Sequence, residues 1–132
     1  MSIFIDTSAI LAVLDADDQY HAKADEVWQD ILSSREDLTT TNYVLVETFA
    51  LVQRRLGWEA VKIFQEDLVP ALEIEWVTEA SHRTAVDMLF LLSHRQLSLV
   101  DCISFAIMRN VGLRKAFTFD SHFKEQGFET IP

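Results

Sequence analysis

Apolar residues follow two alternating patterns along the chain. Short β-rich or alternating runs are separated by longer segments in which apolar residues recur at i, i+3, i+4 and i+7, as in Ala24, Val27, Trp28, Ile31 and Leu32. The runs predict strands over residues 2–5, 38–41, 73–77 and 116–119, with an edge strand over 129–131. The longer segments predict helices over residues 9–14, 19–34, 42–56, 58–69, 79–94, 99–111 and 121–126.

Strands and helices alternate throughout, which favours an α/β fold with a mostly parallel central sheet flanked by helices. Hydrophobic residues make up 49% of the 132 residues, enough to form a core. No linker, internal repeat or low-complexity segment interrupts the pattern. We therefore expect a single domain over residues 1–132.

The charge balance narrows the classes of function. The chain has 11 basic and 21 acidic residues, a formal net charge of −10, which argues against broad binding of nucleic acid through a basic surface. The apolar runs are far shorter than the roughly 20 residues that cross a bilayer. The N-terminus has no signal-peptide pattern, and the single cysteine fits a reducing compartment. We expect a cytoplasmic protein with no membrane segment.

Four acidic residues have an unusual context. Asp6 and Asp120 follow predicted strands, whereas Glu47 and Asp101 lie among apolar residues in predicted helices. Ligands of open parallel sheets bind at the carboxyl ends of the strands, where all four side chains can converge. Converging carboxylates either take up protons or bind a cation. Oxygen-only donors suit Mg²⁺ or Mn²⁺, and such an ion promotes hydrolysis of phosphodiesters.

Each of the four acids also has a structural interpretation. Three are in positions typical of helix N-terminal caps: Asp6, Asp120, and Asp101 in a capping box with Ser98. Glu47 is too far from Asn42, the expected cap of its helix, to have that role. Its alternative is an ion pair with Arg54 or Arg55.

Four segments together resemble the signature segments of PIN domains. They are residues 4–9 (FIDTSA), 41–48 (TNYVLVET), 97–106 (LSLVDCISFA) and 118–123 (TFDSHF), followed by Gly127 and Phe128. The group that they resemble most is that of the VapC-like toxins of prokaryotic toxin–antitoxin pairs. The resemblance extends over essentially the whole chain and includes all four acids.

This resemblance implies an α/β/α sandwich and a Mg²⁺- or Mn²⁺-dependent endoribonuclease. Asp6, Glu47, Asp101 and Asp120 are the implied catalytic and metal-binding residues. Polar residues that match supporting positions are Thr7, Asn42, Ser104 and Thr118. The implied products have 5′-phosphate and 3′-hydroxyl ends. The implied partners are an RNA substrate, a cognate antitoxin and a second copy of the chain.

Other classes fit less well. An aspartyl phosphatase needs a second aspartate two residues after Asp6, where this chain has Ser8. The four histidines have no zinc-site spacing, and Cys102 has no visible activating partner, so we interpret Cys102 as a core residue. A PIN-fold nuclease of RNA maturation and a non-catalytic module that binds RNA or protein remain alternatives. The second would tolerate loss of an acid.

Overall fold

Five parallel strands form one sheet in the computed structural model, which describes residues 2–132. The strands are β1 (Ser2–Ile5), β2 (Asp37–Thr41), β3 (Leu72–Glu75), β4 (Lys115–Phe117) and β5 (Glu129–Ile131). Their order is β3-β2-β1-β4-β5, so β5 is an edge strand. Phe4 of β1 is in register with Thr39 of β2 on one side and with Ala116 of β4 on the other. The predicted α/β class with a parallel sheet is confirmed.

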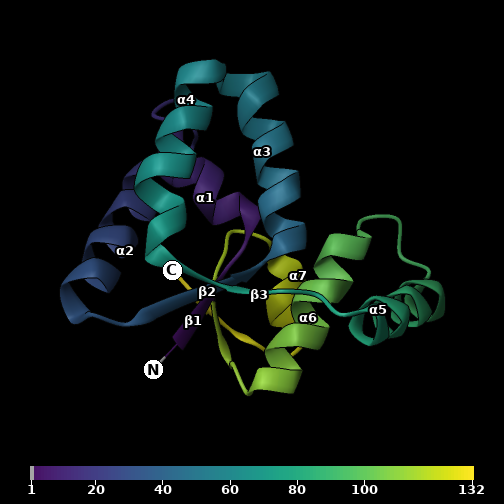
Figure 1. Cartoon of the computed structure of the whole chain (residues 1–132). Helices are drawn as coiled ribbons and strands as arrows, with labels where there is room; N and C mark the ends of the chain where they lie inside the picture. Colours follow the sequence, from purple (N-terminus) through teal and green to yellow (C-terminus); the bar gives the residue numbers. More distant parts are fainter. Residues whose placement is uncertain (1) are drawn as a thin grey trace.

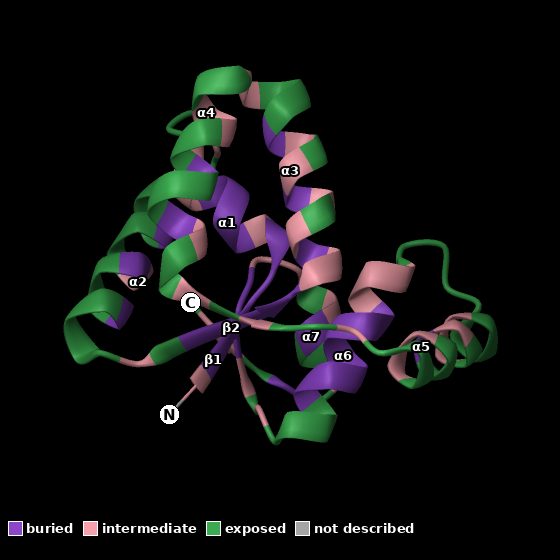
Figure 2. Cartoon of the chain, viewed as in Figure 1, coloured by how far each residue is buried: buried purple, intermediate pink, exposed green. Residues whose placement is uncertain are grey.

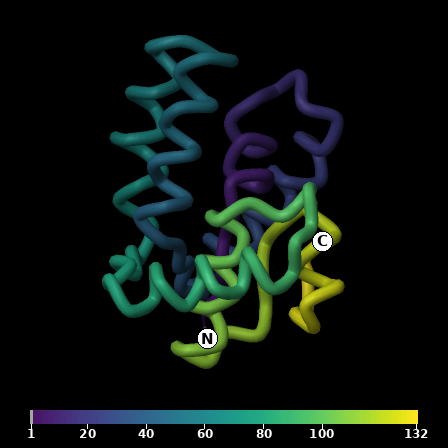
Figure 3. The backbone as a smooth tube through the Cα atoms, turned by 90° about the vertical axis from the view of Figure 1, so that its right-hand side faces the viewer, coloured from purple at the N-terminus to yellow at the C-terminus, as the bar shows by residue number. Residues whose placement is uncertain are grey.

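Helices cover both faces of this sheet (Figure 1). They are α1 (Thr7–Leu14), α2 (His21–Ser34), α3 (Asn42–Leu56), α4 (Trp58–Ile63), α5 (Glu79–Leu92), α6 (Leu99–Val111) and α7 (Ser121–Glu125). Helices α1 to α4 are grouped on one side, and α5 to α7 on the other. In the rotated view, α3 and α4 run side by side as a long hairpin that extends away from the sheet (Figure 3). No helix within residues 2–132 has the length and apolar composition to span a membrane.

The core lies on both sides of the central strands, where Figure 2 shows buried residues. Ile3, Phe4 and Ile5 of β1 are at most 2% exposed, as expected for a strand of a parallel sheet that is covered on both faces. Phe105 of α6 packs edge-on against Phe123 of α7, with ring centroids 5.0 Å apart. Cys102 is also fully buried, which confirms its interpretation as a core residue.

The strand order creates a switch point between β1 and β4. The chain continues from β1 to β2 on one side of β1, whereas β4 pairs with its other side. Ligands of open α/β sheets bind at such a point, outside the carboxyl ends of the strands. Asp6 follows β1 directly and Asp120 follows β4 closely, so this crevice is where both carboxylates are placed.

The cap of α3 differs from the prediction by one residue. Thr41, not Asn42, has the extended backbone of a cap, and its hydroxyl accepts a 3.1 Å hydrogen bond from Val44 N. Asn42 is the first helical residue, and its Oδ1 accepts a 2.8 Å bond from Val77 N. Asn42 therefore ties the segment after β3 to the start of α3, a role that local capping rules do not predict.

Two strands end earlier than predicted, for different reasons. The strand expected over residues 116–119 ends at Phe117. Beyond it, Phe119 N donates to Ser8 Oγ and Asp120 N donates to Thr118 Oγ1. Asp120 thus follows the strand after a two-residue turn rather than directly. The strand expected over residues 73–77 spans Leu72–Glu75, because β2 ends at Thr41, opposite Glu75.

Two helices also differ from the prediction. The helix expected over residues 58–69 is α-helical only to Ile63 and then widens into a π turn, Phe64–Leu68, before a 3₁₀ turn, Val69–Ala71. Pro70 lacks the N–H that an α-helix needs there. The helix expected over residues 79–94 ends at Leu92, and Phe90 near its end is 75% exposed.

Candidate active site

Asp6 is placed at the start of α1 with one carboxylate oxygen engaged. Its Oδ1 accepts hydrogen bonds from Ser8 Oγ at 2.7 Å and from Ala9 N at 3.3 Å, so it caps the helix as the local pattern suggests. The residue is only 7% exposed. Burial raises the pKa of Asp6 to about 7; the hydrogen bonds from Ser8 and Ala9 oppose this increase, and the charge of Asp120 adds to it.

Asp120 approaches Asp6 from the end of β4. Its Oδ1 accepts a 2.9 Å hydrogen bond from His122 N and caps α7. The His122 ring lies beside the same oxygen, with Nδ1 2.8 Å away, close enough for an ion pair when the imidazole is protonated but without the direction of a hydrogen bond. His94, from the α5–α6 loop, packs edge-on against His122, with ring centroids 5.3 Å apart.

Asp101 reaches the same region from α6. Ser98 and Asp101 form the predicted capping box: Ser98 N donates to Asp101 Oδ2 at 3.0 Å, and Asp101 N donates to Ser98 Oγ at 3.1 Å. Burial raises the pKa of Asp101, and the charge of Asp120 contributes further. Asp120 therefore lies within electrostatic range of both Asp6 and Asp101.

The capping interpretation and the functional one are compatible. The caps engage Oδ1 of Asp6, Oδ2 of Asp101 and Oδ1 of Asp120. The second oxygen of each carboxylate takes no part in capping. Capping fixes the orientation of each carboxylate and uses only one of its two oxygens.

Glu47 lies apart from this trio. It is half-buried on α3 and lines a pocket together with Val100, the neighbour of Asp101. The ion pairs within residues 2–132 join Arg83 to Glu79 and His122 to Asp120, so Glu47 has no ion pair with an arginine. Its position relative to Asp6 is maintained by neighbours, since Thr7 Oγ1 and Thr48 Oγ1 are 3.2 Å apart.

The described residues contain no cluster of three or more histidine, cysteine or acidic side chains with the spacing of a formed metal site. The donor set nevertheless fits a hard divalent cation, because it consists of carboxylate oxygens, and burial together with the charge of Asp120 raises the pKa of Asp6 and of Asp101. A cation between them would replace mutual repulsion by attraction.

The supporting residues divide into two groups. Thr118 belongs to the site, because its Oγ1 accepts from Asp120 N and lies 3.3 Å from Ser8 Oγ. Thr7 and Asn42 do not contact the acids by hydrogen bonds; Thr7 contacts Thr48, and Asn42 accepts a bond from Val77 N. Ser104 donates to Val100 O within its own helix and makes no hydrogen bond to an acid among the described residues.

Ser8 was missed as a site residue. Its hydroxyl donates to Asp6 Oδ1, accepts from Phe119 N at 2.9 Å and contacts Thr118. The only local signal is its position two residues after Asp6, the spacing at which a serine hydroxyl reaches back to a preceding carboxylate. The contacts to the β4 end arise from the sheet order and have no signature in the sequence.

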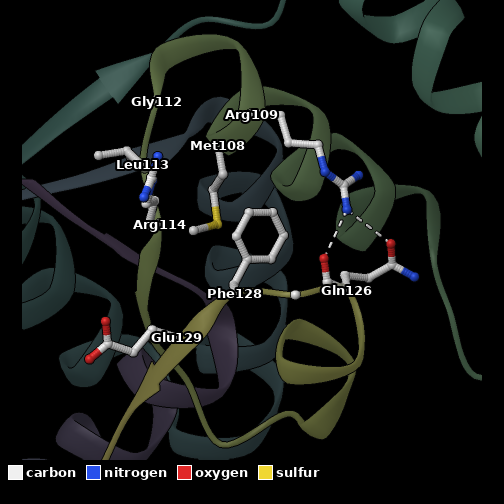
Figure 4. A pocket seen from close by; sticks show the side chains of 9 residues that line it. Met108, Arg109, Gly112, Leu113, Arg114, Gln126, Phe128 and Glu129 are labelled. Atoms are coloured by element: carbon white, nitrogen blue, oxygen red, sulfur yellow. Dashed lines mark hydrogen bonds between the residues drawn. The ribbon is translucent and has the colours of Figure 1, made fainter.

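A larger cavity lies near the N-terminal ends of β4 and β5, whereas the acids lie near the C-terminal ends of the strands. It measures about 570 Å³ and lies between the end of α6 and the start of β5. Figure 4 shows Arg109 at its rim, donating to the backbone and side-chain oxygens of Gln126 and lying over the Phe128 ring. None of the four predicted acids lines it.

The five-stranded parallel sheet with helices on both faces is the fold of a PIN-type α/β domain. The PIN domain family model matches residues 3–129, and the chain belongs to this family.

Similar proteins come from several bacteria. The chain is 36% identical to the 23S rRNA-specific endonuclease VapC20 of Mycobacterium tuberculosis over 98% of this chain and 97% of that protein. It is 21% identical to a VapC ribonuclease of Aquifex aeolicus, over 96% and 93% of the two chains. The crystal structure of VapC20, described as a sarcin–ricin loop cleaving toxin, superposes with a TM-score of 0.86 over 98% of this chain and 99% of that one.

The FitAcB structure from Neisseria gonorrhoeae is 16% identical, has a TM-score of 0.69 and supports the fold alone. It covers 100% of this chain and 97% of its own. The expected PIN and VapC-like resemblance is thus confirmed.

Proposed function

We propose that this protein is a divalent-metal-dependent endoribonuclease that acts as the toxin of a toxin–antitoxin pair. The relatives are named as an endonuclease and a ribonuclease, which agrees with RNA cleavage. The observation that carries the metal dependence is the trio of Asp6, Asp101 and Asp120. Each uses one oxygen as a cap, and burial, with the charge of Asp120 adding to it, raises the pKa of the other two.

In this proposal the acidic trio holds Mg²⁺ or Mn²⁺, directly or through water. The bound ion supplies Lewis-acid activation of the phosphate and of the attacking water. Glu47, on the neighbouring helix, helps to hold the ion or orients that water. Ser8 and Thr118 keep Asp6 and Asp120 in place by hydrogen bonding. Hydrolysis leaves 5′-phosphate and 3′-hydroxyl ends.

Ribosomal RNA is the first substrate to test, because VapC20 is named as specific for 23S rRNA and the two chains align almost end to end. We also propose an antitoxin partner, a homodimer and a cytoplasmic location. Large exposed side chains on helices of both faces support protein partners: Trp58 on α4, and Phe90 and Leu91 on α5, are at least 65% exposed.

The test is an RNA cleavage assay with a matched pair of variants. Purified protein, verified as folded and free of antitoxin, is incubated with ribosomal, transfer and messenger RNA in Mn²⁺, in Mg²⁺ and in EDTA. Asp101→Asn keeps a cap oxygen but loses a charged ligand. Asp30→Asn, on the exposed face of α2, makes the same change away from the site.

We expect discrete, metal-dependent fragments from the wild type and from Asp30→Asn. Removing a hydrogen-bond partner of a metal ligand lowers activity roughly 10- to 100-fold. Losing the charged Asp101 ligand itself should lower the cleavage rate by at least that much. Cleavage by Asp101→Asn at the wild-type rate would overturn the site. Cleavage that persists in EDTA would overturn the metal dependence, and a complete absence of cleavage would favour a binding module.

A further inference from the structure

A small pocket opens beside Glu47, between α3 and α6. It measures about 310 Å³ and is lined by Asn42, Tyr43, Val46, Glu47 and Val100. Val46 is 69% exposed although it lies in the middle of a well-formed helix. This volume is at the lower end of small-ligand pockets, which span roughly 300–1,000 Å³, so it suits one compact group.

The pocket lies beside one of the acids that we assign to cleavage and next to the sequence neighbour of another. Glu47 is part of its wall, and Val100 directly precedes Asp101. A group in the pocket would therefore be next to the phosphate on which those acids act. The phosphate itself is a poor occupant of this pocket, because Val46 and Val100 offer it no charge or hydrogen bond. The net charge of −10 of the chain disfavours an anion there further.

The flat, weakly polar part of an RNA chain is the base. Proteins that read single-stranded RNA hold splayed bases against aromatic and apolar side chains and hydrogen-bond their edges. From its position and lining we propose that this pocket binds the nucleobase next to the scissile phosphate. The inference rests on the proposed ribonuclease function and names a base subsite for it.

Hydrogen bonds hold two polar side chains of the pocket, Tyr43 and Asn42, in place. The Tyr43 hydroxyl lies 2.6 Å from His82 Nδ1 on α5, which fixes the ring in the pocket wall. Asn42 Oδ1 accepts a hydrogen bond from Val77 N, which holds this side chain at the edge of the pocket. The subsite therefore holds a base mainly through apolar contact with Val46 and Val100.

The test pairs a protein variant with a modified substrate. Once the cleavage site has been mapped, an oligoribonucleotide that contains it is made intact and with an abasic nucleotide on either side of the scissile bond. kcat/KM is measured for the wild type, for Val46→Ala, which keeps a good helix former in α3, and for Val111→Ala. Val111 is an exposed valine at the far end of α6 and serves as the control.

We expect one abasic position to lower kcat/KM of the wild type and of Val111→Ala roughly tenfold, and to affect Val46→Ala much less. On intact RNA, kcat/KM of Val46→Ala should be roughly five- to tenfold lower than that of the wild type. Equal abasic losses in all three proteins, or none, would overturn the subsite and leave the nuclease standing. If the wild type cleaves no RNA, the nuclease proposal fails and the subsite fails with it.

A second measurement separates the base from another copy of the chain. Val46→Glu places a charge at the mouth of the pocket, and sedimentation velocity then compares its oligomeric state with that of the wild type. We expect no change in sedimentation together with weaker cleavage. A shift to a smaller species would show that a second copy covers the pocket, which would overturn its assignment to RNA.

Discussion

Ser8 Oγ donates a 2.7 Å hydrogen bond to Asp6 Oδ1 and accepts a 2.9 Å bond from Phe119 N. One hydroxyl thus joins the carboxylate at the end of β1 to the backbone that leads from β4 to Asp120. The two acids belong to segments from opposite ends of the sequence, and Ser8 sets their relative position. Because pairs of carboxylates bind a cation only at a defined separation, we expect this bond to affect the proposed metal-dependent activity.

Ser8→Ala is expected to lower metal-dependent cleavage roughly 10- to 100-fold, the typical cost of losing a partner of a metal ligand. The loss should include a weaker apparent affinity for Mn²⁺, which a purely structural role would leave unchanged. Titrating Mn²⁺ in the cleavage assay measures it. Ser34→Ala, at an exposed serine that donates only to Ile31 O, is the control. Identical Mn²⁺ titrations for the wild type and Ser8→Ala would contradict this role.

The pKa of Asp6 predicts how the metal-free protein depends on pH. This pKa is near 3.8 for an ordinary aspartate and about 7 in the folded chain, so the folded state holds the proton more tightly. The resulting stabilisation is complete below about pH 4 and is lost as pH rises through about 7; it is on the order of 4 kcal/mol.

Urea unfolding in EDTA at several pH values between 4 and 8 measures this effect against Asp6→Asn, which stays neutral. We expect the wild type to lose stability relative to the variant as pH rises across that range. If the free energies of unfolding of the two proteins change in parallel with pH, Asp6 does not titrate as described.

Metal binding should release a proton from Asp6. At pH 6 this carboxyl is mostly protonated in the free protein, and it must ionise to act as a ligand. Calorimetric titration with Mn²⁺ at pH 6, in two buffers of different ionisation enthalpy, should show the release of most of one proton. At pH 8.5 we expect little release. Release at pH 6 that is unchanged in Asp6→Asn would place the proton on another group.

Thr41→Ala is expected to destabilise the protein by about 1 kcal/mol, because it removes the cap of α3. Thr41→Ser keeps the hydroxyl and loses only the methyl group, so the difference between the two variants isolates the cap. Urea unfolding midpoints measure it. Equal midpoints for the two variants would mean that the hydroxyl contributes nothing to the stability of α3.

Features that depend on neighbours in the sequence were predicted well. Apolar spacing located every strand and most helices, and the Ser98–Asp101 capping box was predicted from residue types three positions apart. The errors are at boundaries where a distant group intervenes. Thr41 replaces Asn42 as a cap because Asn42 bonds to Val77, and β4 ends at Phe117 because Ser8 and Thr118 supply the next hydrogen bonds.

The candidate site shows the same division. The sequence selects Asp6, Glu47, Asp101 and Asp120, because an acid next to a strand end or inside an apolar helix is locally unusual. It does not select Ser8, whose partners are Phe119 and Thr118. Nor does it reveal that Asp120 is coupled electrostatically to Asp6 and Asp101 whereas Glu47 lies on the wall of an apolar pocket.

The sequence by itself determined the elements, the parallel class of the sheet and the acids, because periodicity, capping and residue chemistry act over a few neighbouring positions. Only the tertiary structure decided that β4 pairs with β1, and hence that Asp120 faces Asp6 across a switch point. Strand order depends on how helices from distant parts of the chain pack on the two faces of the sheet. That packing is a property of the whole fold, and no local pattern encodes it.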